Sequence, residues 1–197
     1  MAQSRKPAAG AVKSPSPVYQ LRVELLYLKP TIWRQVLVPG SITLVKLHRV
    51  FQWSMGWEDE HLHEFEFDGT CYGQPDLDFP TDPPMLNEVR VPLTQALGAS
   101  KSFTYLYDFG DNWEHKVKIE KILAPDPELR LPMCLAGGNA CPPEDVGGPP
   151  GYIGFLEAIN DQSHEDHEQT LEWCGGSFDP DAFNLDAVNR DLSRIKP

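Results

Sequence analysis

SFTYLYDFGDNWEHKVKIEKIL, residues 102–123, is the stretch that decides the fold. Its two halves, 102–109 and 113–123, alternate apolar and polar side chains, a pattern typical of strands that bury one face. Gly110-Asp111 lies between the halves and favours a tight turn between antiparallel strands. The stretch therefore predicts a β-hairpin.

The predicted hairpin places a carboxylate near an imidazole. If Gly110-Asp111 form a two-residue turn, Asp108 pairs with Trp113, and Asp108 and His115 share one face at a diagonal. A carboxylate beside a partly buried imidazole fixes its tautomer and raises its pKa. Such a pair serves as a general base, as a metal ligand with a supporting carboxylate, or as a structural hydrogen bond, which is the commonest of the three.

The residues before this hairpin predict three more strands and a helix. Residues 18–28 and 32–38 alternate on either side of a proline turn, which predicts a second antiparallel hairpin. Between 41 and 55 apolar residues recur every three or four positions, which predicts an amphipathic helix that ends at Gly56. Residues 61–69 alternate again and predict a strand.

The remaining segments have irregular or helical patterns. Residues 71–92 contain five prolines and predict an irregular loop, and the Pro- and Gly-rich run 125–150 predicts a long connection. Residues 151–160, 165–174 and 181–195 predict helices.

Together these elements predict an α+β domain. Their order lacks the strand–helix alternation of a parallel α/β sheet and fits a mainly antiparallel sheet of about five strands with helices packed on one side. We expect residues 18–197 to form this single domain. Residues 1–17 are rich in Ala, Pro and Ser and lack large apolar side chains, which predicts a disordered tail.

The chain is strongly acidic. It contains 17 Lys and Arg against 29 Asp and Glu, which gives a formal net charge of −12. Three of the basic residues and none of the acidic ones lie in residues 1–17, so the predicted domain carries −15. Because a protein that binds nucleic acid neutralises phosphates with basic side chains, this charge disfavours direct nucleic-acid binding.

The cysteines and the hydropathy of the chain predict its location. The four cysteines show no CxxC spacing, and no apolar run is long enough for a signal peptide or a membrane span. We therefore expect a cytoplasmic protein with reduced thiols and no membrane association.

HLHEF, residues 61–65, offers two imidazoles on one face of a predicted strand. His61 and His63 are two residues apart, so in a strand both point to the same side. Two histidines spaced in this way can bind one metal ion, although zinc requires further ligands. The alternative is that both end a core stripe and hydrogen-bond to the backbone. The candidate ligands for a divalent metal are His61, His63, Asp108 and His115.

CPPEDVGG, residues 141–148, places two adjacent acids in a loop that prolines stiffen and glycines free. Glu144 and Asp145 can bind a cation or a basic group. They can equally favour the positive end of the dipole of the helix that follows. The sequence favours these two interpretations about equally.

Four stretches resemble one known family. They are residues 32–73, YDFGDNWEHKVKIE at 107–120, PMCLAGGNACPPEDVGGPPGY at 132–152 and FDPDAFNLDAVN at 178–189. Through them the chain resembles, over residues 18–193, the family named after the third open reading frame of a root-inducing plasmid. The resemblance implies a compact α+β domain and association with mobile elements, without an established activity.

Some members of that family carry a transposon-resolvase label. A recombinase needs a Ser or Tyr nucleophile served by several arginines, together with a surface that binds DNA. The arginines of this chain are scattered along an acidic domain, so we reject that function here.

The absence of a nucleophile motif, a complete metal signature and a phosphate-binding loop favours a non-catalytic binding or regulatory module. The three motifs would form one cleft for an unidentified small molecule or protein of basic or amphipathic character. The alternative is a metal-binding protein or a metal-dependent hydrolase that uses the His and Asp ligands. The cleft would have aromatic walls and an acidic rim, formed by Trp33, Trp57, Tyr107, Trp113, Glu144 and Asp145.

Overall fold

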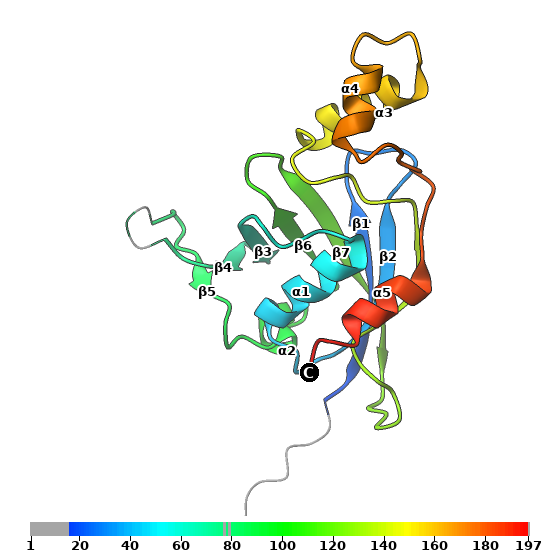
Figure 1. Cartoon of the computed structure of the whole chain (residues 1–197). Coiled ribbons are helices and arrows are strands. Elements are labelled where there is room, and N and C mark those ends of the chain that lie inside the picture. Colours follow the sequence, from blue (N-terminus) through cyan, green and yellow to red (C-terminus); the bar gives the residue numbers. More distant parts are fainter. Residues whose placement is uncertain (1–15, 77, 79, 197) are drawn as a thin grey trace, which may run out of the picture.

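The computed structural model describes residues 16–76, 78 and 80–196. The predicted tail falls almost wholly on residues 1–15, which lie outside the described residues. The described residues form a single α+β unit of one sheet and its helices (Figure 1). None of the helices in these ranges is long and apolar enough to cross a membrane.

The sheet has eight strands in the spatial order β5-β4-β3-β6-β7-β1-β2-β8, where the sequence predicts about five. It is mixed, since β4 and β5 pair in parallel while the other neighbours are antiparallel. The strands are β1 (Val18–Leu25), β2 (Trp33–Pro39), β3 (His63–Phe67), β4 (Thr70–Gly73), β5 (Leu86–Asn87), β6 (Ser102–Tyr107), β7 (Trp113–Leu123) and β8 (Met133–Gly138).

Three of these strands lie in segments that the sequence predicts to be irregular. β4 and β5 are short and close one edge of the sheet, and β8 closes the other edge. Both residues of β5 are exposed and β8 buries only Cys134, so neither shows the alternation that marks a strand. They form because β3 and β2 would otherwise present unpaired backbone groups at the sheet edges.

β6 and β7 form the predicted hairpin with a longer turn than predicted. Tyr107, rather than Asp108, pairs with Trp113, and residues 108–112 connect the strands. Asp108 and Asn112 adopt left-handed backbone conformations, with φ of 56° and 58°. This loop removes Asp108 from the ladder, so its predicted pairing with Trp113, and the diagonal contact with His115 that depends on it, are wrong.

The helices occupy two regions of the molecule. In Figure 1 α1 and α5 lie in front of the sheet, whereas α3 and α4 lie beyond its end. The predicted packing of helices on one side of the sheet therefore holds for only some of the helices. α1 ends as predicted at Gly56, which is left-handed with φ 108°. The helices are α1 (Leu44–Met55), α2 (Leu93–Leu97), α3 (Gly148–Asn160), α4 (His167–Trp173) and α5 (Leu185–Leu192).

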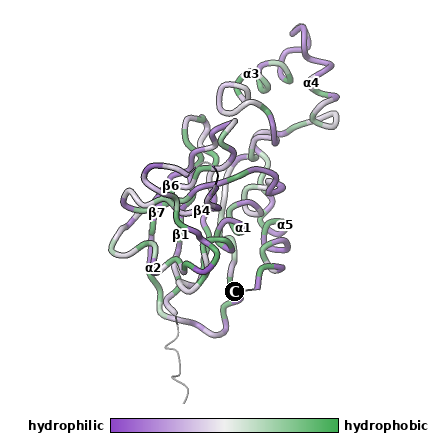
Figure 2. The backbone as a smooth tube through the Cα atoms, turned by 90° about the vertical axis from the view of Figure 1, so that its left-hand side faces the viewer, coloured by the Kyte–Doolittle hydropathy of each residue, from purple (hydrophilic) through white to green (hydrophobic). Residues whose placement is uncertain are grey.

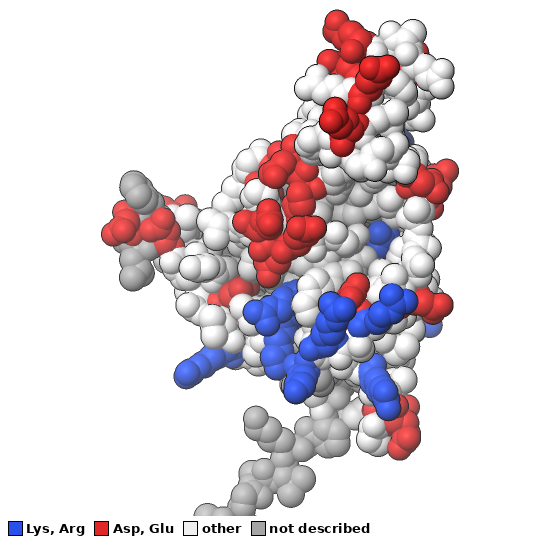
Figure 3. Space-filling model, in the orientation of Figure 1, with Lys and Arg blue, Asp and Glu red and all other residues white. Residues whose placement is uncertain are grey.

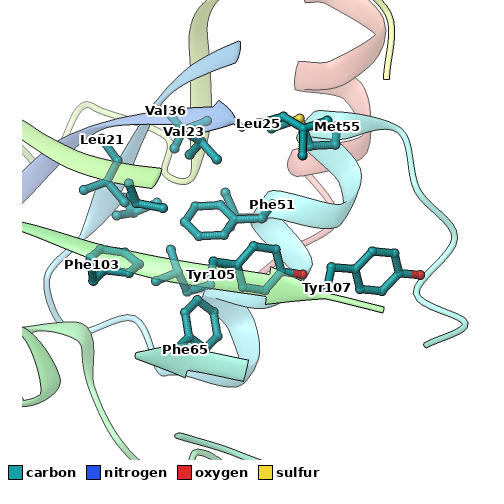
Figure 4. Close-up of a cluster of buried hydrophobic side chains, with 14 of the residues drawn as sticks. Leu21, Val23, Leu25, Val36, Phe51, Met55, Phe65, Phe103, Tyr105 and Tyr107 are labelled. Atoms are coloured by element: carbon teal, nitrogen blue, oxygen red, sulfur yellow. The ribbon is translucent and has the colours of Figure 1, made fainter. Parts of the chain in front are cut away.

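An aromatic core fills the space between α1 and the sheet (Figure 4). Phe51 of α1 is fully buried, and its ring centroid lies 6.1 Å from that of Phe65 and 5.1 Å from that of Tyr105. Alternate side chains of β6 and β7 supply this core, and Figure 2 shows hydrophobic and hydrophilic residues mixed along the strands. Burial of each such ring contributes roughly 1.5–3 kcal/mol. This packing fixes the end of the hairpin that carries Asp108.

Candidate functional site

Four polar side chains converge where the β6–β7 hairpin turns. Nε2 of His61 lies 3.1 Å from Oδ1 of Asp145, 3.7 Å from Oδ2 of Asp108 and 3.9 Å from Oε2 of Glu144. His61, Asp108 and Asp145 each offer one ligand atom, and these atoms lie within 4.8 Å of one another. The three sequence motifs therefore meet at one place.

Two atoms of this cluster are buried without a hydrogen-bond partner, namely Nε2 of His61 and Oε2 of Glu144. Although Oδ1 of Asp145 is 3.1 Å away, the imidazole nitrogen forms no hydrogen bond with it. Buried polar atoms in folded proteins are nearly always paired. Two unpaired polar atoms that face each other indicate a place where one shared partner, such as a cation, can bind.

The turn after β6 orients Asp108 toward this cluster. Oδ1 of Asp108 accepts a hydrogen bond of 2.8 Å from the backbone N–H of Gly110, which leaves Oδ2 facing His61. The backbone N–H of Asp108 donates to the carbonyl of Leu62, which holds the HLHEF motif alongside. Asp108 and Asp145 both have left-handed backbones, with φ of 56° and 57°. Such conformations cost about 1–2 kcal/mol per residue and concentrate at functional sites.

Glu144 is held by two donors on one oxygen and faces His61 with the other. Its Oε1 accepts hydrogen bonds from the Tyr107 hydroxyl at 3.0 Å and from the backbone N–H of Glu58 at 2.9 Å. Burial raises the pKa of Glu144, and the two hydrogen bonds oppose this shift. The pKa of Tyr107 is also raised, chiefly by burial, so its hydroxyl is a neutral donor at neutral pH.

Close backbone contacts fix the CPPEDVGG loop against the hairpin turn. The N–H of Gly147 donates a bond of 3.0 Å to Oδ2 of Asp111. A Cβ at Gly148, where φ is 69°, would lie 2.3 Å from the carbonyl oxygen of Asp111, so only glycine fits. The indole N–H of Trp57 donates to the carbonyl of Pro142 and holds the other end of the loop. These contacts place Glu144 and Asp145 beside Asp108.

Neither acid of this loop caps α3 through a hydrogen bond. α3 begins at Gly148. Its N-cap residue, Gly147, makes no side-chain cap hydrogen bond, and the first turn of the helix contains no acid. Glu144 is bonded to Tyr107 and Glu58 instead. That these acids bind a cation or a basic group stays a prediction.

His63 belongs to a neighbouring cluster rather than to that of His61. Its ring stacks on His48 with 3.5 Å between centroids, and its Nε2 lies 3.0 Å from Oε2 of the buried Glu88. His48 also contacts the Tyr105 hydroxyl and the Asp59 carboxylate. Burial, followed by the charge of His63, lowers the pKa of His48 to about 4. The two histidines of HLHEF thus serve different clusters.

His115 lies in the core and does not reach Asp108. It is fully buried, its Nδ1 lies 3.2 Å from the carbonyl oxygen of Tyr105, and its Nε2 has no partner. Its ring meets the Trp57 ring edge-on at 5.3 Å. Burial lowers its pKa to about 4, so His115 is a neutral imidazole at neutral pH.

Three of the four predicted aromatic wall residues lie together behind the acidic cluster. The Trp57 ring centroid is 4.9 Å from that of Tyr107 and 6.0 Å from that of Trp113. All three side chains are buried, so they support the site from within rather than line an open cleft. Trp33 lies elsewhere, with the Arg22 guanidinium 4.1 Å above its ring.

The donor set suits a divalent cation. Protein ligands lie about 2.0–2.2 Å from zinc, so neighbouring ligand atoms lie roughly 3–3.5 Å apart. The separations of 3.1, 3.7 and 3.9 Å from Nε2 of His61 are near this spacing, and the ligand atoms of His61, Asp108 and Asp145 lie within 4.8 Å of one another. A divalent ion would also offset the charge of three neighbouring carboxylates.

A family model described as plasmid pRiA4b ORF-3-like protein matches residues 17–187. The chain belongs to the plasmid pRiA4b ORF-3-like family. This membership confirms the resemblance that the sequence motifs predict.

Two relatives of this plasmid pRiA4b ORF-3-like protein extend over nearly all of the chain. An uncharacterized protein, y4hQ of Sinorhizobium fredii (strain NBRC 101917 / NGR234), is 45% identical over 181 residues, which are 90% of this chain and 92% of the relative. The crystal structure of a protein of unknown function, MM3350 of Methanosarcina mazei Go1, matches with a TM-score of 0.80 and 37% identity, and covers 89% and 98% of the two chains. The MM3350 structure supports the fold, and neither relative has an established activity in its name.

The sequence did not predict the neighbouring cluster around His63, in which His48, Asp59 and Glu88 take part. His48, Asp59 and Glu88 are far apart in sequence, and Glu88 lies in a segment predicted to be loop. One signal was present, because His48 falls on the apolar face of the predicted helix. A histidine in that position needs buried polar partners.

Proposed function

We propose that this protein binds a divalent metal ion through His61, Asp108, Glu144 and Asp145. The observation that carries the proposal is the pair of buried, unpartnered atoms, Nε2 of His61 and Oε2 of Glu144, which face each other beside two further carboxylates. Carboxylates suit manganese and imidazole suits zinc, so Mn²⁺ and Zn²⁺ are the favoured ions. His63 and His115, which the sequence also suggests as ligands, are not part of this proposal.

A metal ion at this position would be accessible from outside. The side chain of Asp145 is 68% exposed, whereas those of Asp108 and Glu144 are 11% and 17% exposed. A bound ion would thus have protein on one side and solvent on the other. This arrangement supports a binding module that recognises its ligand through the metal, and it also supports the hydrolase alternative, in which the metal activates a water molecule.

The test is metal analysis of protein purified without a histidine tag. We expect about one equivalent of manganese or zinc, and a rise in melting temperature when either ion is added after chelation. An ion at a hundred times its dissociation constant stabilises the folded state by about 2.7 kcal/mol. For a chain of this size, that shift corresponds to roughly 5–10 °C.

Matched variants separate specific binding from general effects of cations. His61→Ala and Asp145→Asn should abolish the thermal shift, whereas His164→Ala, which changes a histidine outside the cluster, should leave it intact. Mg²⁺ and Ca²⁺ serve as comparison ions, because a site made of oxygen ligands alone would favour them. If neither stoichiometric metal nor a shift that depends on His61 is found, the proposal is wrong.

A further inference from the structure

We infer that the groove between α3 and α4 binds a cationic, amphipathic segment of a partner protein. The groove has a volume of about 470 Å³, within the usual range for ligand sites. Its lining includes both apolar and polar side chains. Six of its lining residues are Phe155, Trp173, Asp145, His164, Asp166 and Gln169.

The apolar part of the groove is partly exposed aromatic surface. Trp173 of α4 is 51% exposed, and its ring meets the buried ring of Phe155 nearly edge-on at 5.9 Å. An exposed tryptophan in a groove is suited to contact a partner, because tryptophan is enriched among residues that dominate binding energy.

The charge around the groove selects a cationic partner. The stretch from residue 131 to residue 189 contains eleven Asp and Glu and no Lys or Arg. Six of these acids lie on or between α3 and α4, and all six are exposed. Figure 3 shows Asp and Glu over this part of the molecule and Lys and Arg over α1 and α5. A Lys or Arg side chain beside an apolar residue would complement both the acids and Trp173.

This inference goes beyond the proposed metal site and does not depend on it. Asp145 lines the groove and also faces His61, so a segment bound in the groove would lie next to the metal site. The other groove residues named above take no part in the metal cluster. Binding of a peptide and binding of a metal can therefore be measured separately.

The experiment uses the full chain and a fluorescein-labelled peptide of nine residues with alternating Arg and Leu. Binding is followed by fluorescence anisotropy, with EDTA present so that the metal site plays no part. We expect saturable binding of one peptide per chain at 0.1 M salt, and weaker binding at 0.5 M salt because surface charge is screened. The same peptide with Glu in place of Arg should not bind.

Two variants locate the binding site. Trp173→Ala should weaken binding about tenfold or more, as for a central aromatic contact. Asp166→Lys should weaken it several-fold, whereas Asp126→Lys, which makes the same change of charge on an exposed loop before β8, should have a much smaller effect. Circular dichroism verifies that each variant is folded.

The possible outcomes are distinct. If the Arg and Glu peptides bind alike, if binding does not saturate, or if Asp126→Lys and Asp166→Lys have equal effects, the inference is overturned. If peptide binding is normal but no metal binds, the metal proposal fails while the groove stands. If metal binds but the peptide does not, the groove inference fails while the metal proposal stands.

Discussion

The hydroxyl group of Tyr107 donates a hydrogen bond of 3.0 Å to Oε1 of Glu144 and so joins the end of β6 to the CPPEDVGG loop. Because Oε1 is occupied in this way, Oε2 is turned toward His61. The Tyr107 ring packs against that of Trp57, which fixes the position of the hydroxyl group. Tyr107 is thus a positioning residue for a proposed metal ligand.

Tyr107→Phe should weaken metal binding without unfolding the protein. The ring and its packing remain, but Glu144 loses one donor, so its carboxylate is less well oriented and its pKa rises further. Loss of such a supporting hydrogen bond typically reduces metal affinity about 10- to 100-fold. Isothermal titration calorimetry with Mn²⁺ or Zn²⁺ measures the effect.

A matched tyrosine provides the control for that variant. Tyr27 donates a hydrogen bond of 2.8 Å to Glu114 on the exposed surface, away from the cluster. Tyr27→Phe should leave metal affinity unchanged. Equal affinities for the two variants and the wild type would show that the Tyr107 hydroxyl does not position a ligand.

Gly148→Ala should loosen the loop that carries Glu144 and Asp145. The added Cβ would lie 2.3 Å from the carbonyl oxygen of Asp111, and φ is 69°. The left-handed backbone alone costs about 1–2 kcal/mol. We expect a lower free energy of unfolding in urea and a weaker metal affinity. Gly154→Ala, where a Cβ meets nothing within 4 Å inside α3, should be neutral or stabilising and should leave affinity intact.

His61→Ala should affect metal binding, whereas His63→Ala should affect the stability of the fold. Nε2 of His61 faces the carboxylates of the proposed metal cluster, and its half-buried ring makes one edge-on contact with Tyr107, so its loss should abolish metal binding with little change in stability. Removal of His63 leaves Glu88, which is 3% exposed, without its imidazole partner, and loss of the partner of a buried polar group typically costs about 1–3 kcal/mol. Metal titration and urea unfolding of both variants test this contrast, which would vanish if both histidines bound one ion.

His115 should make the protein sensitive to acid. Burial lowers its pKa to about 4 in the folded state, whereas an imidazole in the unfolded chain has a pKa near 6.5. Its contribution to stability is complete above pH 6.5 and is lost as the pH falls from there through about 4, because the unfolded state binds the proton first. The loss amounts to about 3 kcal/mol.

His115→Gln should remove this part of the pH dependence. The free energy of unfolding in urea at pH 7.5 and at pH 4.5 should differ less for the variant than for the wild type. His48, whose pKa is also lowered to about 4, should retain its own share of the effect. If the free energy of unfolding differs between the two pH values as much for the variant as for the wild type, the buried imidazole of His115 does not oppose protonation.

The sequence determined the local elements and the family. The alternation at 102–123 was enough for β6 and β7, and the apolar spacing at 41–55 was enough for α1, because each pattern reflects which side of one element is buried. It also identified the three motifs that meet at the candidate site. It could not identify β5 or β8, whose backbone pairs with neighbouring strands while their side chains carry no periodic signal.

Only the tertiary structure decided which polar side chains share a site. His61 and His63 are separated by one residue, yet they face different clusters, because β3 begins at His63 and His61 precedes the strand. Asp108 turns away from His115 because its left-handed backbone lies in a five-residue loop. Glu144 reaches His61 across more than eighty residues because Gly147 and Gly148 let the loop approach Asp111. Such long-range contacts depend on packing between elements, and a pattern within one element does not encode them.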